Sequence, residues 1–369
     1  MKLRMKTADL AKALFRVQGI VDRRSTMPAL SHALLTAQQG ELRVGATDAD
    51  VSLSAVYPAE VASQGSIAVV AKQLFEVART ISVPNVEMEV GRQNRLFLRT
   101  EQSRFQLAGM AAEDFPEYAE HEDIDAFPLV VGRLMAMVDR TLFCASTDEN
   151  RHHLGGVYCE TPKPSTLRMV STDGHRLALA DGQFDTTLRL EQGVIVPRKA
   201  LSELKRIAAN LDADEQISVG FRRNAAVFRL PDTTLTTRLV EGQFPHYQQV
   251  IPEGADRRAV LPRAAFAEAL RRVSLLSQGR SYGVRFHFAD GCLMLSAEDP
   301  DRGQAEETLA VDYKAEPLEV GFNARYILDV LHWLDDDQVA FELVDTLSPG
   351  ILRPVKDSGF LAIVMPMRF

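Results

Sequence analysis

The sequence repeats one pattern three times, with a period of roughly 125 residues. Each copy begins with a short strand that leads into an amphipathic helix and continues with a hairpin that has an acidic turn. A second strand and helix follow, and alternating strands end the copy. One similar segment arises easily by chance, but four segments in the same order three times do not. Because 369 residues also exceed what one core usually supports, we expect three similar domains.

The helical segments of the repeats have apolar residues at helical spacing. In "AVLPRAAFAEALRRVSLLS" the apolar side chains of Phe266, Leu270 and Val273 form one stripe, with Arg271 and Arg272 on the other side. Segments such as "VEMEVGRQNRLFLRT" instead alternate every two residues, which is typical of half-buried antiparallel strands. The prediction is an α+β fold in which each domain packs two helices on antiparallel sheets. The expected domains span residues 1–121, 127–251 and 257–369.

The hairpin of each repeat has an aspartate at the same place. The segments are "ELRVGATDADVSLSA", "TLRMVSTDGHRLALA" and "CLMLSAEDPDRGQAEETLA", and their aspartates are Asp48, Asp173 and Asp299. Asp-Gly and Asp-Pro favour turns because Asp bonds its own backbone and Gly tolerates positive φ. Asp173 and His175 could also act together as the general base of a hydrolase, with Asp173 orienting the histidine. A hydrolase is therefore the alternative function. The other repeats have "TDAD" and "EDPD" there, which favours the turn.

Other signals of catalysis or metal binding are weak. GxSxG, HExxH, GxxxxGK[ST] and GxGxxG do not occur in the sequence. His152 and His153 follow Asp148 and Glu149, but adjacent side chains diverge and rarely bind one ion together. We therefore expect no catalytic residue, no metal and no cofactor.

Several features indicate a cytoplasmic protein. The three cysteines have no CxxC spacing, which argues against a disulfide framework and fits a reducing compartment. The N-terminal segment "MKLRMKTADLAKALF" is interrupted by charges, unlike a signal peptide. No run of residues approaches the roughly 18 apolar residues of a membrane span, so no membrane association is expected.

The basic residues concentrate in the helices, although the formal net charge is −8. Five helical segments (7–24, 71–80, 132–141, 198–210 and 263–280) hold 16 of the 42 Lys and Arg but only 6 of the 50 Asp and Glu. In any single helix, the excess of basic residues could simply be a solvated face. Recurrence in equivalent helices instead favours a positive surface that binds a polyanion without base readout. The acidic run Asp335 to Asp337 after the sixth helix departs from this pattern.

The motifs "STDGHRLALA", "VIVPRKALSELKR", "LVEGQFPHYQQVIP", "VGFNARYILDVL" and "VMPMRF" resemble the bacterial sliding clamp family, the beta subunit of DNA polymerase III. The resemblance covers the whole chain. It implies a ring-shaped, head-to-tail homodimer in which the helices line a hole around double-stranded DNA. It also implies a non-catalytic processivity factor in DNA replication. The implied partners are the DNA polymerase III catalytic subunit, the clamp loader and repair proteins, all bound through short hydrophobic peptides.

The resemblance also implies three sets of site residues. The DNA-binding residues are Arg24, Lys72, Arg151, His152, His153, Arg198, Lys199 and Arg280. The dimer-interface residues are Arg104, Phe105, Leu107, Leu275, Leu276, Glu298 and Glu306. The peptide-binding pocket residues are Leu154, Thr172, Gly174, His175, Arg176, Leu177, Pro245, Val250, Leu347, Pro349, Val364, Met365, Pro366, Met367 and Arg368. Gln249 stands where familiar members have Arg, and Phe369 ends the chain where they have Leu.

Overall fold

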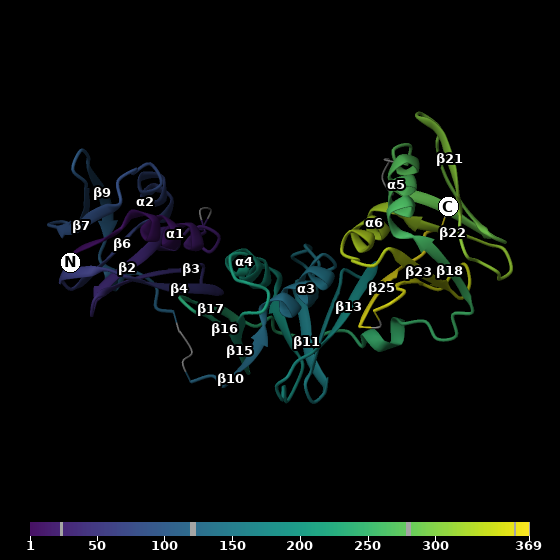
Figure 1. The fold of residues 1–369 in the computed structure, drawn as a ribbon, viewed down its shortest axis with the longest axis horizontal. Helices are drawn as coiled ribbons and strands as arrows, with labels where there is room; N and C mark the ends of the chain where they lie inside the picture. Colours follow the sequence, from purple (N-terminus) through teal and green to yellow (C-terminus); the bar gives the residue numbers. More distant parts are fainter. Residues whose placement is uncertain (23–24, 119–122, 278–281, 358, 369) are drawn as a thin grey trace. The chain divides into compact units, whose positions relative to one another are not determined.

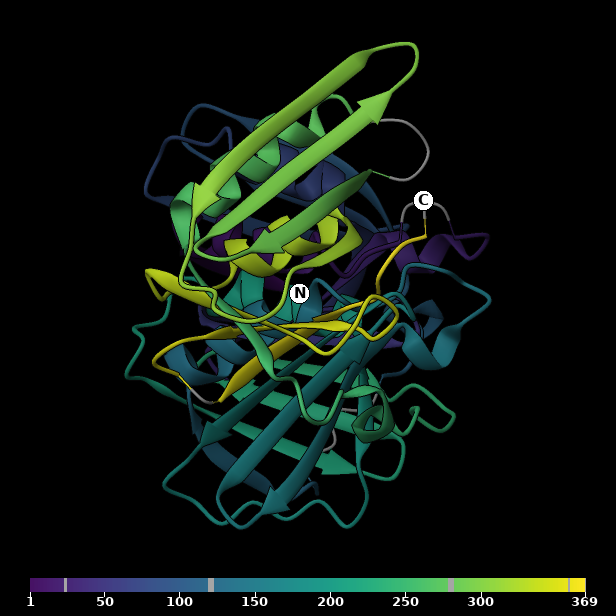
Figure 2. The ribbon, with the colours of Figure 1, turned by 90° about the vertical axis from the view of Figure 1, so that its right-hand side faces the viewer.

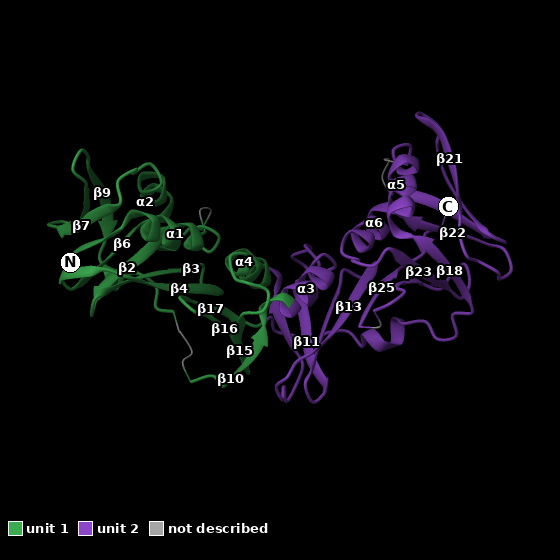
Figure 3. Ribbon diagram, viewed as in Figure 1, with its two compact units in different colours: residues 1–132, 199–239 green, residues 133–198, 240–369 purple. Residues whose placement is uncertain are grey.

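The computed structural model describes residues 1–22, 25–118, 123–277, 282–357 and 359–368. The chain divides into two compact units (Figure 3). The first unit consists of Met1–Gly132 and Lys199–Leu239, and the second of Arg133–Arg198 and Val240–Phe369. The central third of the sequence therefore contributes to both units. No helix in the described ranges is long and apolar enough to cross a membrane.

The first unit is built on one sheet of 13 strands, in the order β10-β15-β16-β17-β4-β3-β2-β6-β9-β8-β7-β1-β5 (Figure 1). All its pairings are antiparallel. The strands are β1 Lys2–Lys6, β2 His32–Gln38, β3 Glu41–Thr47, β4 Val51–Pro58, β5 Glu60–Ser63, β6 Gly65–Val70, β7 Asn85–Gly91, β8 Arg95–Arg99, β9 Arg104–Met110, β10 Ala126–Val130, β15 Gln216–Arg222, β16 Ala225–Leu230 and β17 Thr233–Arg238. The helices are α1 Thr7–Val17, α2 Ala71–Ala78 and α4 Arg198–Ala208, with 3-10 turns η1 Pro28–Ser31 and η2 Ala112–Asp114.

The second unit contains two antiparallel sheets. One has the order β14-β11-β12-β13-β25-β24-β23-β18 and the other β21-β20-β19-β22. The strands are β11 Gly156–Lys163, β12 Thr166–Thr172, β13 Arg176–Gln183, β14 Val194–Pro197, β18 Arg257–Pro262, β19 Gly283–Ala289, β20 Cys292–Asp299, β21 Gly303–Ala310, β22 Leu318–Asn323, β23 Gln338–Leu343, β24 Gly350–Pro354 and β25 Phe360–Val364. The helices are α3 Val131–Leu142, α5 Arg263–Ser274 and α6 Ala324–His332, with 3-10 turns η3 His152–Leu154 and η4 Tyr247–Val250.

The predicted stripe on α5 is confirmed. Phe266, Leu270 and Val273 are all buried, and α5 packs on the four-stranded sheet, as Figure 2 shows for the light green strands in front of the helices. Burying side chains of this size contributes about 1.5 to 3 kcal/mol each. The stripe thus fixes which face of α5 meets the sheet, and the arginines Arg271 and Arg272 remain exposed.

The three hairpin turns contain the predicted aspartates. The Asp48 carboxylate accepts hydrogen bonds from the backbone N–H groups of Asp50 (3.0 Å) and Val51 (2.7 Å). Asp173 accepts them from His175 (3.0 Å) and Arg176 (3.1 Å) in the same way. Asp299 accepts one from Asp301 at 3.0 Å. Each carboxylate closes its own turn, so the repeated aspartate has a structural role.

Candidate functional site

A largely apolar cavity of about 160 Å³ lies in the second unit. It is bounded by the hairpin turn before β13, the segment that enters η4, and the end of β25. Its lining residues are Leu154, Thr172, Gly174, Arg176, Leu177, Pro245, His246, Tyr247, Val250, Ile363 and Met365. Val250 and Met365 remain 47% and 40% exposed, so apolar side chains at the opening are accessible to a ligand. Such a site suits an apolar side chain of a peptide, and flexible Met365 can adapt to different ones.

Eight of the fifteen pocket residues expected from the sequence line this cavity, namely Leu154, Thr172, Gly174, Arg176, Leu177, Pro245, Val250 and Met365. The other seven are not among its lining residues. His175 and Arg368 are exposed, Leu347 is 66% exposed, and Pro349, Pro366 and Met367 are half-buried. Val364 is fully buried, because Ile363 and Met365 occupy the alternate positions of the chain that face the cavity.

His246, Tyr247 and Ile363 also line the cavity, although they were not predicted from the sequence. The repeated Phe-Pro-x-Tyr turn was a signal for Tyr247, since it recurs at 115–118 and 244–247. The signal for Ile363 was hidden, because "FLAIV" is apolar at every position and shows no alternation.

Tyr247 is held by a polar network behind the cavity. Its hydroxyl donates to Glu160 at 2.5 Å and accepts from Arg168 at 3.2 Å. Arg168 in turn makes two hydrogen bonds of 2.7 Å to the Asp181 carboxylate. Burial, followed by the hydrogen bond to Glu160, raises the pKa of Tyr247 to about 12. The hydroxyl therefore stays protonated as a donor at neutral pH and fixes the ring in the wall.

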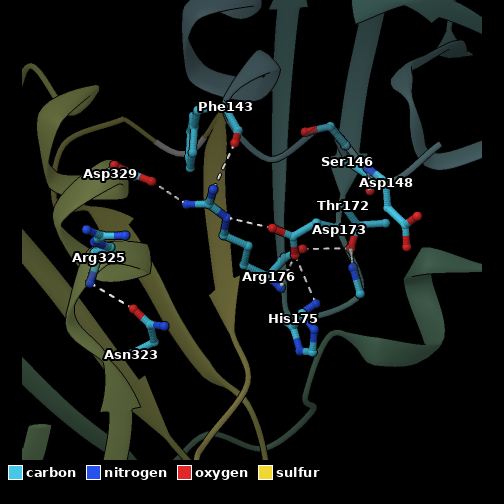
Figure 4. A network of polar contacts seen from close by, with 12 residues as sticks. Phe143, Ser146, Asp148, Thr172, Asp173, His175, Arg176, Asn323, Arg325 and Asp329 are labelled. Atoms are coloured by element: carbon cyan, nitrogen blue, oxygen red, sulfur yellow. Dashed lines mark hydrogen bonds and ion pairs between the residues drawn. The ribbon is translucent and has the colours of Figure 1, made fainter. Parts of the chain in front are cut away.

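Arg176 anchors the hairpin side of the cavity (Figure 4). Its guanidinium donates to Asp173 at 3.0 Å, to Asp329 on α6 at 2.5 Å and to the Phe143 carbonyl at 3.0 Å. It also lies over the Tyr326 ring, 4.6 Å from the centroid. With its side chain only 12% exposed, Arg176 joins the turn to α6 and to the chain after α3. Its position is thus determined by the fold before any ligand binds.

The geometry does not support the hydrolase alternative. The carboxylate oxygens of Asp173 bond backbone N–H groups and Arg176. The His175 ring stacks 6.4 Å from the Tyr326 ring. In the described chain no side-chain hydrogen bond joins Asp173 to His175. Among the same residues no three His, Cys, Asp or Glu side chains form a group that could hold a metal ion.

The expected DNA-binding residues have different surroundings. Lys72 and Arg198 are exposed, and within the described ranges their side chains make no ion pair. Arg151 is bonded to Asp148 (3.1 Å) and to the Asp173 carbonyl (3.0 Å). Lys199 bonds the Asp48 carboxylate and the Ile20 carbonyl. His152 is exposed and His153 half-buried, both in η3, whereas Arg24 and Arg280 lie outside the described residues.

Several other basic helix residues serve the fold rather than a free surface. Arg16 is 4% exposed and bonds Asp232 and Thr233. Arg206 donates to the Phe15 and Arg16 carbonyls at the end of α1. Arg140 pairs with Asp335 (3.3 Å) and Asp357 (2.7 Å). The count of charges along the helices therefore overstates the accessible positive charge.

The acidic run after α6 is also accounted for by local contacts. Asp335 pairs with Arg140, and the Asp336 and Asp337 carbonyls accept hydrogen bonds from Arg263. The backbone N–H of Lys356 donates to the Asp336 carboxylate at 2.8 Å, which lowers its pKa. These aspartates join the end of α6 to neighbouring segments of the same unit.

The expected interface residues lie on strands at or next to two sheet edges and, for Leu275 and Leu276, just after α5. β6 pairs with β9 only at Gly109 and Met110, so residues 104–108, which include Arg104, Phe105 and Leu107, have a strand on one side alone within the described chain. β21 ends the four-stranded sheet and carries Glu306, while Glu298 lies on adjacent β20. Leu275, just after α5, is 58% exposed, and Leu276 is half-buried. Unpaired edges of this kind favour pairing with another chain.

Comparisons with known proteins place the whole chain in one family. Three protein-family models match the chain in order. They are the N-terminal, central and C-terminal domains of the DNA polymerase III beta subunit, at residues 1–119, 129–246 and 248–368. The chain is 36% identical over 363 residues to the beta sliding clamp of Pseudomonas putida, with 97% of each chain covered. It is 35% identical over 373 residues to the beta sliding clamp of Caulobacter vibrioides, with 100% of each covered.

Solved structures give the same result. A crystal structure of the Caulobacter crescentus beta sliding clamp has a TM-score of 0.94 and 34% identity, covering 100% of this chain and 99% of the other. A Bartonella birtlesii sliding clamp bound to griselimycin has a TM-score of 0.95 and 34% identity, with 100% of each chain covered. With its three repeated α+β domains in the family's order, the chain belongs to the family of the DNA polymerase III beta subunit, the beta sliding clamps.

Proposed function

We propose that the protein is a DNA sliding clamp, which encircles duplex DNA as a homodimer and tethers the replicative polymerase. The observation that carries this proposal is the full-length match to all three beta-subunit domains in order. The clamp contributes no catalytic group. Its effect is to keep the polymerase at a high local concentration near the primer end, which raises processivity. Because the DNA that it encircles is bacterial, we place the protein in the cytoplasm. Its three domains span residues 1–121, 127–251 and 257–369.

DNA contact in this proposal is electrostatic and independent of sequence. Lys72 and Arg198 provide exposed cations, Arg151 adds a third, and His152 and His153 beside it add ring N–H donors. Lys199 contributes by exchanging Asp48 for a phosphate. Arg24 and Arg280 complete the set. Weak contacts suit a ring, because closure around the duplex retains the protein while the cations exchange phosphates.

Ring closure joins the unpaired edge of β9 in one chain to the β21 edge in its partner. Arg104 provides positive charge on β9, and Glu298 and Glu306 provide negative charge at the other edge. Phe105 and Leu107 on the first side, and Leu275 and Leu276 on the second, supply apolar area. The contact is head to tail and closes after two subunits.

The apolar cavity serves as the docking site for partner peptides. The polymerase catalytic subunit, the clamp loader and repair proteins insert a Leu or Phe side chain between Leu177 and Met365. Residues near the opening contact the rest of the peptide; we assign this role to His175, Leu347, Pro349, Pro366, Met367 and Arg368. Val364 is fully buried and supports the wall from behind. Docking one segment at a time lets a single clamp exchange partners.

Primer extension by the DNA polymerase III catalytic subunit tests the proposal. With clamp and clamp loader present, we expect the polymerase to make longer DNA products in each binding event. The Met365→Ala substitution shortens these products. It also lowers the affinity of the clamp for a fluorescent Leu-Phe peptide about tenfold, because an apolar contact is lost. Met27→Ala is the matched control, because Met27 is also exposed but lies outside the cavity. Product lengths that do not respond to the wild-type protein would refute the clamp function.

A further inference from the structure

A second cavity, of about 260 Å³, lies in the first unit and is polar. It is bounded by the turn between β3 and β4, the segment after η2, and the end of β17. Its lining residues are Thr47, Ala49, Asp50, Ser52, Glu117, Tyr118, Asn224, Ala225, Thr236, Thr237 and Arg238.

This cavity is the repeat counterpart of the apolar one. In the first unit Thr237 of β17 pairs with Val51 of β4, and in the second Val364 of β25 pairs with Arg176 of β13. These registers make two lining residues of the first cavity, Thr236 and Arg238, equivalent to Ile363 and Met365 of the second. Counting along the hairpins likewise aligns Thr47 with Thr172 and Ser52 with Leu177, and the two Phe-Pro-x-Tyr turns align Tyr118 with Tyr247.

The hydrogen bonds that shape the two cavities are also the same. Thr47 Oγ1 accepts from the Ala49 N–H at 3.0 Å, as Thr172 Oγ1 accepts from Gly174 at 3.0 Å. The Arg238 N–H donates to the Asp50 carbonyl at 2.8 Å, as Met365 donates to His175 at 2.9 Å. The backbone therefore encloses a cavity of the same form in both units, and the two cavities differ only in their side chains.

The side-chain differences convert an apolar site into a polar one. Leu177, Ile363 and Met365 are replaced by Ser52, Thr236 and Arg238. Three charged side chains, Asp50, Glu117 and Arg238, stand exposed around the opening. In the part of the chain that the structure describes, none of the three makes an ion pair. Two carboxylates against one guanidinium give the site a net negative charge.

We propose that this cavity is a second docking site, which binds an extended polar peptide segment that carries one Lys or Arg side chain. The cation of the peptide pairs with Asp50 and Glu117, and Arg238 donates to a main-chain carbonyl of the peptide. Ser or Asn side chains next to the cation match the hydroxyl-rich wall. Because its chemistry is opposite to that of the apolar cavity, the second site selects a different segment, and both sites can be occupied together.

Titration of the full-length protein with capped peptides tests this inference. The probe is acetyl-Ser-Lys-Asn-Ser-amide, and the control peptide has Glu in place of Lys. Methyl NMR of Ala and Thr residues reports on Ala49, Thr236 and Thr237 in the cavity. We expect saturable shifts of these methyls with the Lys peptide alone. The combined Asp50→Asn and Glu117→Gln substitutions weaken binding about fivefold or more, since they remove both ion pairs.

Glu113→Gln is the matched control, because Glu113 is an exposed carboxylate in η2 that does not line the cavity. It leaves the affinity for the Lys peptide unchanged. Equal binding of the Glu peptide, absence of saturable shifts, or an unchanged affinity in the double variant would overturn the inference. A Leu-Phe peptide titrated in parallel reports on the apolar cavity, so failure at one site is distinguished from failure at the other.

Discussion

Arg176 is the residue whose contacts bear most on the shape of the apolar cavity. Replacing it by Met leaves Asp173 and Asp329 without their shared cation, and we expect the free energy of unfolding to fall by about 3 kcal/mol. Arg271→Met, at an exposed position of α5, should change it by less than about 0.5 kcal/mol. Urea denaturation measures both.

A double-mutant cycle with Asp329→Asn separates the ion pair from the loss of packing. The two changes should be coupled by about 1 kcal/mol, a modest value because the Asp329 side chain is 48% exposed. Strict additivity would show that Asp329 does not hold Arg176.

The cysteines give a second test at this scale. Burial raises the pKa of both the Cys144 and the Cys159 thiol, the latter to about 12, whereas Cys292 is partly exposed. A thiol whose pKa is raised stays protonated at pH 8 and reacts slowly with disulfide reagents. We expect one fast-reacting thiol, Cys292, in the native protein and three after denaturation. Rapid reaction of Cys144 or Cys159 in the native protein would contradict their burial.

Individual residues also show where sequence reasoning reaches its limit. Asp48 and Asp173 were predicted correctly as turn residues, because an Asx turn is local. Arg16 and Arg140 were counted with the surface charges, but they pair with Asp232 and Asp357, 216 and 217 residues away. No local pattern reveals such a partner. Part of the pocket wall was missed for the related reason that a fully buried strand carries no alternation.

Among the elements, the helices and hairpins follow from the repeats, whereas the joins between strands of different repeats do not. β4 pairs with β17, and β13 pairs with β25, so each join uses strands far apart in the sequence. Periodicity shows that a strand has one buried face but not which strand lies beside it. These joins also decide which edges remain unpaired, and so where a second chain can bind.

We propose that the two leucines just after α5 contribute to that contact. Combined Leu275→Ala and Leu276→Ala should weaken dimerisation by a few kcal/mol, roughly what the lost apolar area provides. Sedimentation velocity over a dilution series measures the change, with exposed Leu347→Ala as the matched control. Identical dissociation of the double variant and the wild type would remove these leucines from the interface.

For the whole molecule, the distribution of charge predicts DNA binding better than the net charge does. A chain with net charge −8 can still retain DNA, because a closed ring needs little binding energy. In the proposed ring, the exposed cations of Lys72 and Arg198 ease movement along phosphates rather than provide the affinity. Retention should accordingly depend on DNA topology more than on salt.

Release from linearised DNA shows whether the protein encircles the duplex. Protein loaded by the clamp loader onto nicked circular DNA is isolated by gel filtration, and the circle is then cut once with a restriction enzyme. We expect the protein to stay with the circle and to leave after cutting, and we expect bound protein at both ends to prevent its loss. Equal retention on circular and linear DNA would contradict the claim that it encircles the duplex.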